Sequence, residues 1–78
     1  MNREEAVSWL AQLFEAPSAE VSETTPRDAI PGWDSLGTLT LMAEMDEKFD
    51  IQLSEQEVTD FASVRDVVEL LASRGKLS

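Results

Sequence analysis

The segment GWDSLGTLTL, residues 32–41, leads from a loop into the longest predicted helix of the chain. Ser35, which follows Asp34, is a residue type that commonly caps helix N-termini. Beyond them, apolar residues recur every three or four positions as far as residue 49, a spacing that predicts a helix with one apolar side. We expect Ser35 to be the N-cap of this helix. The question is whether its hydroxyl also has a chemical role.

The composition argues against an enzyme. The 78 residues include no cysteine, no histidine and no tyrosine. Without cysteine there is no disulfide scaffold, no thiolate metal site and no thiol nucleophile. Without histidine the usual general base, and the usual activator of a serine nucleophile, are missing. We therefore expect a non-enzymatic protein with no catalytic residues and no metal site.

Acidic residues dominate the charge of the chain. Sixteen acids and six bases give a formal net charge of −10, and residues 44–60 contain seven acids and one base, a net charge of −6. Nucleic acids and anionic membranes need basic surfaces, so both are poor partners. Basic protein surfaces are suitable partners, although the acids could also serve only to keep a small protein in solution.

Hydropathy gives no sign of a membrane segment. No apolar stretch approaches the roughly 20 residues that span a bilayer, and the first ten residues, MNREEAVSWL, lack the pattern of a signal peptide. We expect a cytoplasmic monomer.

Helical periodicity, caps and breakers predict an all-α domain over residues 1–78. The expected helices cover about 2–15, 35–49, 54–60 and 63–74, which gives three main helices and one short helix. SEQE at 54–57 and SVRD at 63–66 both have the form of a capping box. Between the first two helices, residues 18–34 form a long loop, which we expect Val21, Ile30 and Trp33 to attach to the core.

The predicted helix at 35–49 has an apolar stripe that we interpret as core. Leu41, Met45 and Phe49 repeat every four residues. Leu39 and Met42 lie beside them, and Leu36 lies near the start of the same side. Two methionines in this stripe leave the interior deformable, because methionine fills irregular gaps.

Two other binding functions fit poorly. In a calcium-binding loop starting at Asp46, Lys48 stands where a ligand is required and Ile51 where the turn glycine is required. A helix-turn-helix DNA-binding protein is disfavoured by the acidic charge. A non-enzymatic acidic helical interaction module, in which Ser35 is only a helix cap, remains open.

The order of these features resembles a known family. DSL at 34–36 opens a helix that ends in EKFDIQLS at 47–54. Together with the length, the acidity and the order of helices, this resembles the phosphopantetheine-dependent carrier proteins, the acyl carrier proteins and their aminoacyl relatives. The likeness covers nearly the whole chain and implies an acyl-carrier-protein-like four-helix bundle.

The resemblance also implies a cofactor and its attachment site. A phosphopantetheinyl transferase would join 4′-phosphopantetheine from coenzyme A to Ser35, between Asp34 and Leu36. The thiol of the arm would hold an acyl or aminoacyl group as a thioester. Further partners would be a loading ligase and downstream transferases or synthases with basic docking patches. Of the family's usual acidic docking positions, Asp34, Asp46 and Glu47 match here. We expect Leu36 and Glu44 to bind partners as well, although Glu44 lies on the same helix at a position that the family pattern does not match.

Departures from the family pattern bear on the pathway. Members that serve fatty-acid synthesis commonly have acids where Gly37, Thr40 and Lys48 stand here. DSLGT looks more like the D-alanyl carriers and the stand-alone carriers of specialised pathways. A long acyl chain would favour burial in the bundle, whereas a charged aminoacyl group would stay in solvent. We expect an acyl pocket to be lined by Leu39, Met42, Met45, Phe61 and Val64.

Overall fold

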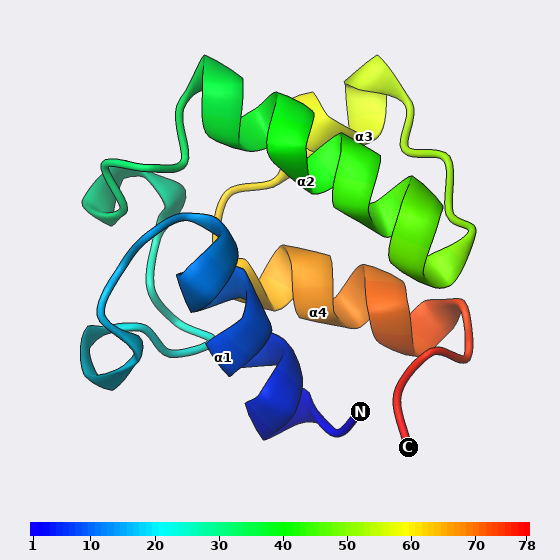
Figure 1. Cartoon of the computed structure of the whole chain (residues 1–78), viewed down its shortest axis with the longest axis horizontal. Helices are drawn as coiled ribbons and strands as arrows, with labels where there is room; N and C mark the ends of the chain where they lie inside the picture. Colours follow the sequence, from blue (N-terminus) through cyan, green and yellow to red (C-terminus); the bar gives the residue numbers. More distant parts are fainter.

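A computed structural model describes residues 1–78 as an all-helical domain with four α-helices and two short 3-10 turns (Figure 1). The α-helices are α1 (Arg3–Leu13), α2 (Ser35–Phe49), α3 (Glu55–Asp60) and α4 (Val64–Ser73). The 3-10 turns, η1 (Ser18–Glu20) and η2 (Arg27–Ala29), lie in the long connection between α1 and α2. The predicted all-α bundle of three main helices and one short helix is confirmed, with helix ends within two residues of those expected.

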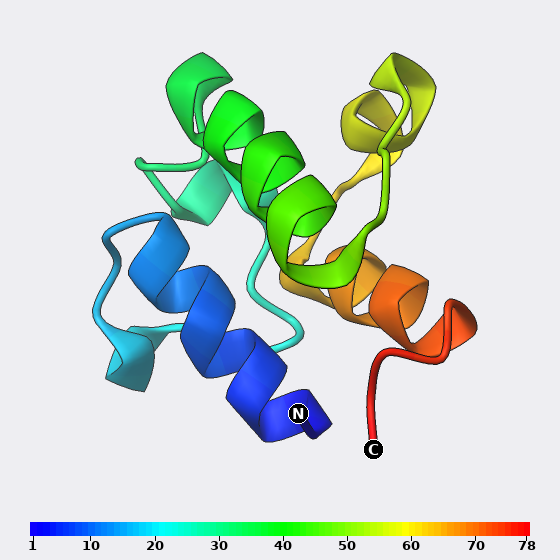
Figure 2. The same ribbon diagram turned by 45° about the vertical axis from the view of Figure 1, so that its right-hand side comes forward.

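Three helices enclose the core. Helices α1, α2 and α4 pack around it, and α3 lies on the side of α2 away from α1 (Figures 1 and 2). Helix α4 contributes the most regular apolar face, because Val64, Val67, Val68 and Leu71 are all fully buried. The other large core side chains come from the remaining α-helices and the connections between them: Leu10, Phe14, Ile30, Trp33, Leu41, Met45, Ile51, Leu53, Val58 and Phe61.

Capping boxes fix where α1 and α3 begin, and the sequence predicts the one at α3. At α1, Glu5 N–H donates to Asn2 Oδ1 (2.8 Å), and Asn2 N–H donates to Glu5 Oε1 (2.9 Å). At α3, the reciprocal pair joins Ser54 and Glu57, at 3.1 and 3.0 Å. The hydrogen bond from the Ser54 backbone N–H lowers the pKa of the Glu57 carboxyl below its ordinary value.

The start and end of α4 also match local signals in the sequence. Asp66 Oδ2 accepts from the N–H groups of Ser63 (3.2 Å) and Ala62 (2.7 Å). Beyond its last turn, Gly75 has a φ of +70°, a left-handed conformation that glycine adopts without steric penalty. Capping residues therefore set both ends of the helix with the most regular buried face.

The interpretation of the apolar stripe of α2 as core is wrong for two of its leucines. Leu36 is 73% exposed and Leu39 is 62% exposed, whereas Leu41 and Met45 are fully buried. The buried side of α2 is formed by Gly37, Leu41 and Met45, which follow one another at intervals of four residues. Leu36 and Leu39 point away from that side because apolar residues occupy more of this helix than one stripe can hold.

The long connection between α1 and α2 is ordered by backbone hydrogen bonds to the start of α4. Arg27 N–H donates to Ala62 O (2.9 Å), and Val64 N–H donates to Thr25 O (3.1 Å). Of the three residues expected to attach it to the core, Ile30 and Trp33 are buried, and half-buried Val21 packs against the core cluster. The connection therefore holds a fixed shape just before the segment that opens α2.

The two ends of the chain lie next to each other. Ser78 N–H donates to Met1 O at 2.9 Å. Both termini lie at the opposite end of the molecule from the start of α2 (Figures 1 and 2). None of the helices has the length and apolar character needed to cross a membrane.

Candidate functional site

The start of α2 is capped by Asp34 and not by Ser35. Asp34 has extended backbone angles, and its Oδ1 accepts a hydrogen bond from Gly37 N–H at 2.9 Å. Ser35 is the first residue inside the helix. The prediction that Ser35 is the N-cap is therefore wrong, because the residue before it supplies both the required backbone conformation and the acceptor oxygen.

The hydroxyl of Ser35 has no structural role in the protein. The residue is exposed, as are Asp34 and Leu36 on either side of it. No hydrogen bond joins the Ser35 hydroxyl to another protein group, although the two nearby threonine hydroxyls, of Thr38 and Thr40, both form hydrogen bonds. The hydroxyl therefore lies open to solvent at the end of α2 where unpaired N–H groups favour an anion.

Two close backbone contacts hold this end of α2 in place. A Cβ atom added at Gly32 would lie 1.9 Å from the carbonyl oxygen of Phe14 at the end of α1. One added at Gly37 would lie 2.0 Å from the carbonyl oxygen of Gly32. The end of α1, the loop and the first turn of α2 thus pack backbone against backbone, which only glycine permits at these two positions.

A shallow depression adjoins Ser35 between α2 and α3. It is lined by Arg27, Ser35, Thr38, Leu39, Val58 and Thr59. The guanidinium of Arg27 donates three hydrogen bonds at this depression. Nη1 donates to Val58 O (2.9 Å) and Phe61 O (3.4 Å), and Nη2 donates to Thr38 Oγ1 (3.2 Å). These bonds connect η2 to both α2 and α3 at the depression.

Arg27 packs against an aromatic stack. The Trp33 ring lies parallel to the Phe14 ring, with centroids 4.8 Å apart, and the Arg27 guanidinium carbon lies 5.4 Å from the Trp33 ring centroid. Sequence reasoning did not single out Arg27. The available signal was its isolation, since it is the sole base between Arg3 and Lys48.

The outward side of α2 places most of the predicted partner-binding residues together. Leu36, Asp46 and Glu47 are exposed along this side, and exposed Leu39 lies among them. Glu44 is half-buried and lines a hollow against α1 with Trp9, Gln12, Leu13 and Thr40. Glu44 therefore lies apart from Leu36, Asp46 and Glu47, while Asp34 adjoins Leu36 at the N-terminal end.

The acids of residues 44–60 are mostly not neutralised by neighbouring bases. The one ion pair that involves them joins Arg74 to Glu57 at 3.3 Å. No three of the acidic side chains come together in a group able to hold a metal ion. This part of the surface consequently presents its negative charge to solvent.

Four of the five residues expected to line an acyl pocket lie in or against the packed interior. Met45, Phe61 and Val64 are buried members of the core cluster, and half-buried Met42 packs against it. Leu39 is on the outer surface instead, beside the depression next to Ser35. Their role toward a cargo stays a prediction.

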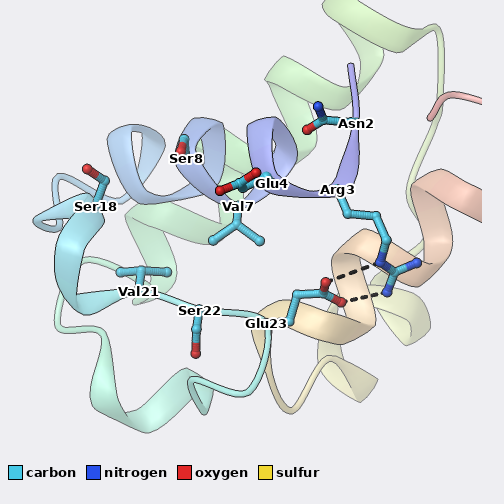
Figure 3. A pocket seen from close by; sticks show the side chains of 9 residues that line it. All are labelled: Asn2, Arg3, Glu4, Val7, Ser8, Ser18, Val21, Ser22 and Glu23. Carbon is cyan, nitrogen blue, oxygen red and sulfur yellow. Dashed lines mark hydrogen bonds and ion pairs between the residues drawn. The ribbon is translucent and has the colours of Figure 1, made fainter. Parts of the chain in front are cut away.

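A larger hollow than the depression beside Ser35 lies elsewhere on the surface. It has a volume of about 620 Å³ and is formed between α1 and residues 18–23 (Figure 3). Val7 and Val21 point into it, and the ion pair of Arg3 with Glu23 closes one end. Arg3 also forms an ion pair with Glu69 of α4 at 2.7 Å. The ion pairs of Arg3 beside this hollow therefore link α1 to the loop and to α4.

A comparison with known families identifies the chain. The family described as phosphopantetheine attachment site matches residues 8–71, which include α2, α3, most of α1 and most of α4. Domains of this family carry a covalently attached 4′-phosphopantetheine, are not catalytic, and interact with phosphopantetheinyl transferases and biosynthetic enzymes. The chain therefore belongs to the phosphopantetheine attachment family and is a carrier protein, not an enzyme.

Proposed function

We propose that Ser35 is the attachment residue and that the chain presents acyl or aminoacyl groups to partner enzymes. The observation that carries this proposal is the state of the Ser35 hydroxyl. It is exposed and has no hydrogen-bond partner, while Asp34 caps the helix in its place. The rival function is an acidic interaction module in which Ser35 serves only as a helix cap. Because Asp34 is the cap, that function no longer explains the presence of Ser35.

The surroundings of Ser35 fit a phosphodiester. The group adds a negative charge at the N-terminus of a 15-residue helix, where the helix dipole and the unpaired N–H groups favour anions. On attachment, Ser35 Oγ gains the bond to phosphorus and loses its proton, and adenosine bisphosphate leaves from coenzyme A. The chain has no histidine to accept that proton, so the base belongs to the transferase. When bound, the group supplies the thiol that carries cargo as a thioester.

The outward side of α2 is the surface we assign to partner enzymes. Near Ser35 it is apolar, with Leu36 and Leu39 exposed, and farther along it becomes acidic at Asp46 and Glu47. Helix geometry separates Leu39 from Glu47 by about 12 Å along the axis, at 1.5 Å per residue. A matching partner has an apolar socket beside its active-site entrance and basic side chains about two helical turns away. Asp34 belongs to the same surface, whereas half-buried Glu44 has a smaller part in it.

The uncharged start of α2 favours a specialised pathway over bulk fatty-acid synthesis. The first turn of α2 contains no acid. Gly37 is required by its contact with Gly32, and Thr40 donates its hydroxyl hydrogen to Leu36 O at 3.0 Å. Neither position offers the negative charge on which basic partners of bulk synthesis depend, so this chain suits a different set of enzymes.

Intact-mass measurement after incubation with coenzyme A and a broad-specificity phosphopantetheinyl transferase tests the attachment residue. The wild-type chain is expected to gain one phosphopantetheinyl group, and Ser35→Ala is expected to gain none. Ser54→Ala is the matched control, because Ser54 also stands at the start of a helix but performs the capping itself. A mass gain that survives in Ser35→Ala would place the arm elsewhere, and no gain in the wild type would contradict the proposal.

A further inference from the structure

The surroundings of Arg27 differ from those of the other arginines of this chain. Arg3, Arg65 and Arg74 each lie within 4.0 Å of a glutamate carboxylate. Arg27 is half-buried, yet no carboxylate lies within that distance of it, and its partners are two carbonyl oxygens and one hydroxyl. A partly desolvated guanidinium without an anionic partner is unfavourable, because it has lost water without gaining a counter-charge.

Arg27 is also placed beside the attachment residue. Both residues line the same depression. Arg27 Nη2 lies 3.2 Å from Thr38 Oγ1, and Thr38 follows Ser35 by three positions on α2. Residues three apart on a helix have Cβ atoms about 5–6 Å from each other, so the guanidinium lies about one helical turn from Ser35.

Some N–H donors of the Arg27 guanidinium have no acceptor in the protein. Nη1 donates to two carbonyl oxygens and Nη2 to one hydroxyl, which leaves the Nε hydrogen and the second Nη2 hydrogen without a protein acceptor. Planar guanidinium groups with two adjacent donors bind phosphate oxygens well. The bonds to Val58 and Phe61 and the Trp33 ring hold the group in place without consuming these donors.

We infer that Arg27 is a positioning residue for the phosphodiester carried by Ser35, supplying the counter-charge beside its attachment point. The inference rests on the proposed function. In the unmodified protein Arg27 connects η2 with α2 and α3. After modification it also pairs with the phosphate, which holds the root of the arm over the depression lined by Leu39 and Val58 and limits its swing around the end of α2.

A thermodynamic cycle separates this role from a purely structural one. Urea unfolding is measured for the unmodified and the fully modified forms of wild type and Arg27→Gln, with modification verified by intact mass. A structural role lowers the stability of both forms equally, and the ratio of their unfolding constants does not change. Pairing with phosphate makes that ratio, modified over unmodified, about fivefold larger in Arg27→Gln than in wild type, as for a partly exposed ion pair.

Salt and a matched arginine sharpen the measurement. The difference between the two ratios is expected to shrink at high ionic strength, because partly exposed charge pairs are screened. Arg74→Gln is the control: it removes an arginine that pairs with Glu57, and it is expected to leave the ratio at its wild-type value. Arg27→Lys keeps the charge but not the planar fork, and an intermediate ratio is expected.

The outcomes distinguish the inference from the function on which it rests. Absence of any mass gain overturns attachment at Ser35 and the inference with it. Full modification with equal ratios in wild type and Arg27→Gln overturns only the role of Arg27. If Arg27→Gln does not fold, the phosphorus NMR signal of modified Arg27→Lys is compared with that of modified wild type and Arg74→Gln. A changed signal in Arg27→Lys alone supports the inference, and an unchanged one overturns it.

Discussion

Helices α2 and α4 use similar apolar residues in different ways. Helix α4 has 10 residues and buries Val64, Val67, Val68 and Leu71 on one face. Helix α2 has 15 residues, yet it buries only Gly37, Leu41 and Met45 and leaves two leucines largely exposed. The shorter helix therefore contributes more side-chain packing to the core than the longer one.

The difference separates a supporting element from a presenting one. The side chains on the inner face of α4 hold the bundle together, while α2 is anchored by a few contacts and turns apolar groups toward solvent next to Ser35. Exposed leucines are not explained by the fold of an isolated domain, because burial would stabilise each by roughly 1.5–3 kcal/mol. In a carrier protein, such residues are available for contact with partner enzymes.

The comparison is tested most strongly by shortening one leucine in each helix. Leu71→Ala in α4 is expected to lower the free energy of unfolding by about 2–5 kcal/mol, because it leaves a cavity in a packed core. Leu39→Ala in α2 is expected to change it by no more than about 0.5 kcal/mol, as for other surface positions. Urea unfolding monitored by circular dichroism measures both.

The functional consequence is expected to be reversed. Leu39→Ala should slow modification or loading by a partner enzyme several-fold while the fold remains intact, which steady-state kinetics at limiting carrier concentration would reveal. Equal losses of stability in the two variants would show that α2 and α4 do not differ in the way described.

A smaller effect is expected at the glycine contact that positions α2. Alanine usually stabilises a helix relative to glycine, by up to about 1 kcal/mol. At Gly37 the added Cβ would lie 2.0 Å from Gly32 O, so Gly37→Ala is expected instead to destabilise by about 1–3 kcal/mol. Thermal unfolding measures the change. Ala43→Gly, at an exposed site in the same helix, is the control for propensity alone. A gain of stability in Gly37→Ala would refute the close packing.

Capping residues offer a third test within two adjacent positions. Asp34→Ala is expected to destabilise the domain by about 1 kcal/mol, because Gly37 N–H loses its acceptor. Ser35→Ala is expected to leave stability within about 0.5 kcal/mol of wild type, because the Ser35 hydroxyl has no partner to lose. Chemical denaturation of the unmodified variants measures both. The reverse order would restore Ser35 as the cap.

The smallest effect concerns the capping carboxylate of α3. The pKa of Glu57 is lowered from its ordinary 4.5 in the folded state, so the unfolded chain takes up this proton first as the pH falls. The stabilisation from Glu57 is therefore present above pH 4.5 and is lost as the pH falls through the lower, folded pKa. Near neutral pH, the free energy of unfolding of wild type is expected to exceed that of Glu57→Gln by less than about 1 kcal/mol.

The pH dependence of that difference is the measurement. Urea midpoints of the two proteins should converge on acidification. The comparison is made between variants because neutralising the other acids also changes stability in both. A difference that grows toward acid pH would mean that the capping carboxylate does not have a lowered pKa.

Local rules were sufficient for most of the fold. The boxes at Ser54 and Glu57 and at Ser63 and Asp66 begin helices where the sequence predicts, because a cap needs only residues within one turn. Gly75 ends the last helix for an equally local reason. The buried side chains of α4 also follow a regular helical spacing.

The site depended on contacts that no local pattern contains. Asp34 and Ser35 are equally good caps by residue type, and only the observed backbone distinguishes them. Leu39 fits an apolar stripe by spacing, but the position of α1 and α4 determines which side of α2 is buried. Arg27 acquires its partners at Val58 and Phe61 from 31 and 34 positions along the chain.

The hydrogen bond between Ser78 and Met1 has a practical consequence for any use of this carrier. A surface anchor, fluorescent label or fused enzyme joined at either terminus leaves from the pole opposite Ser35. Molecules immobilised through a terminus would thus have the end that carries Ser35 facing the solution, where enzymes can reach it.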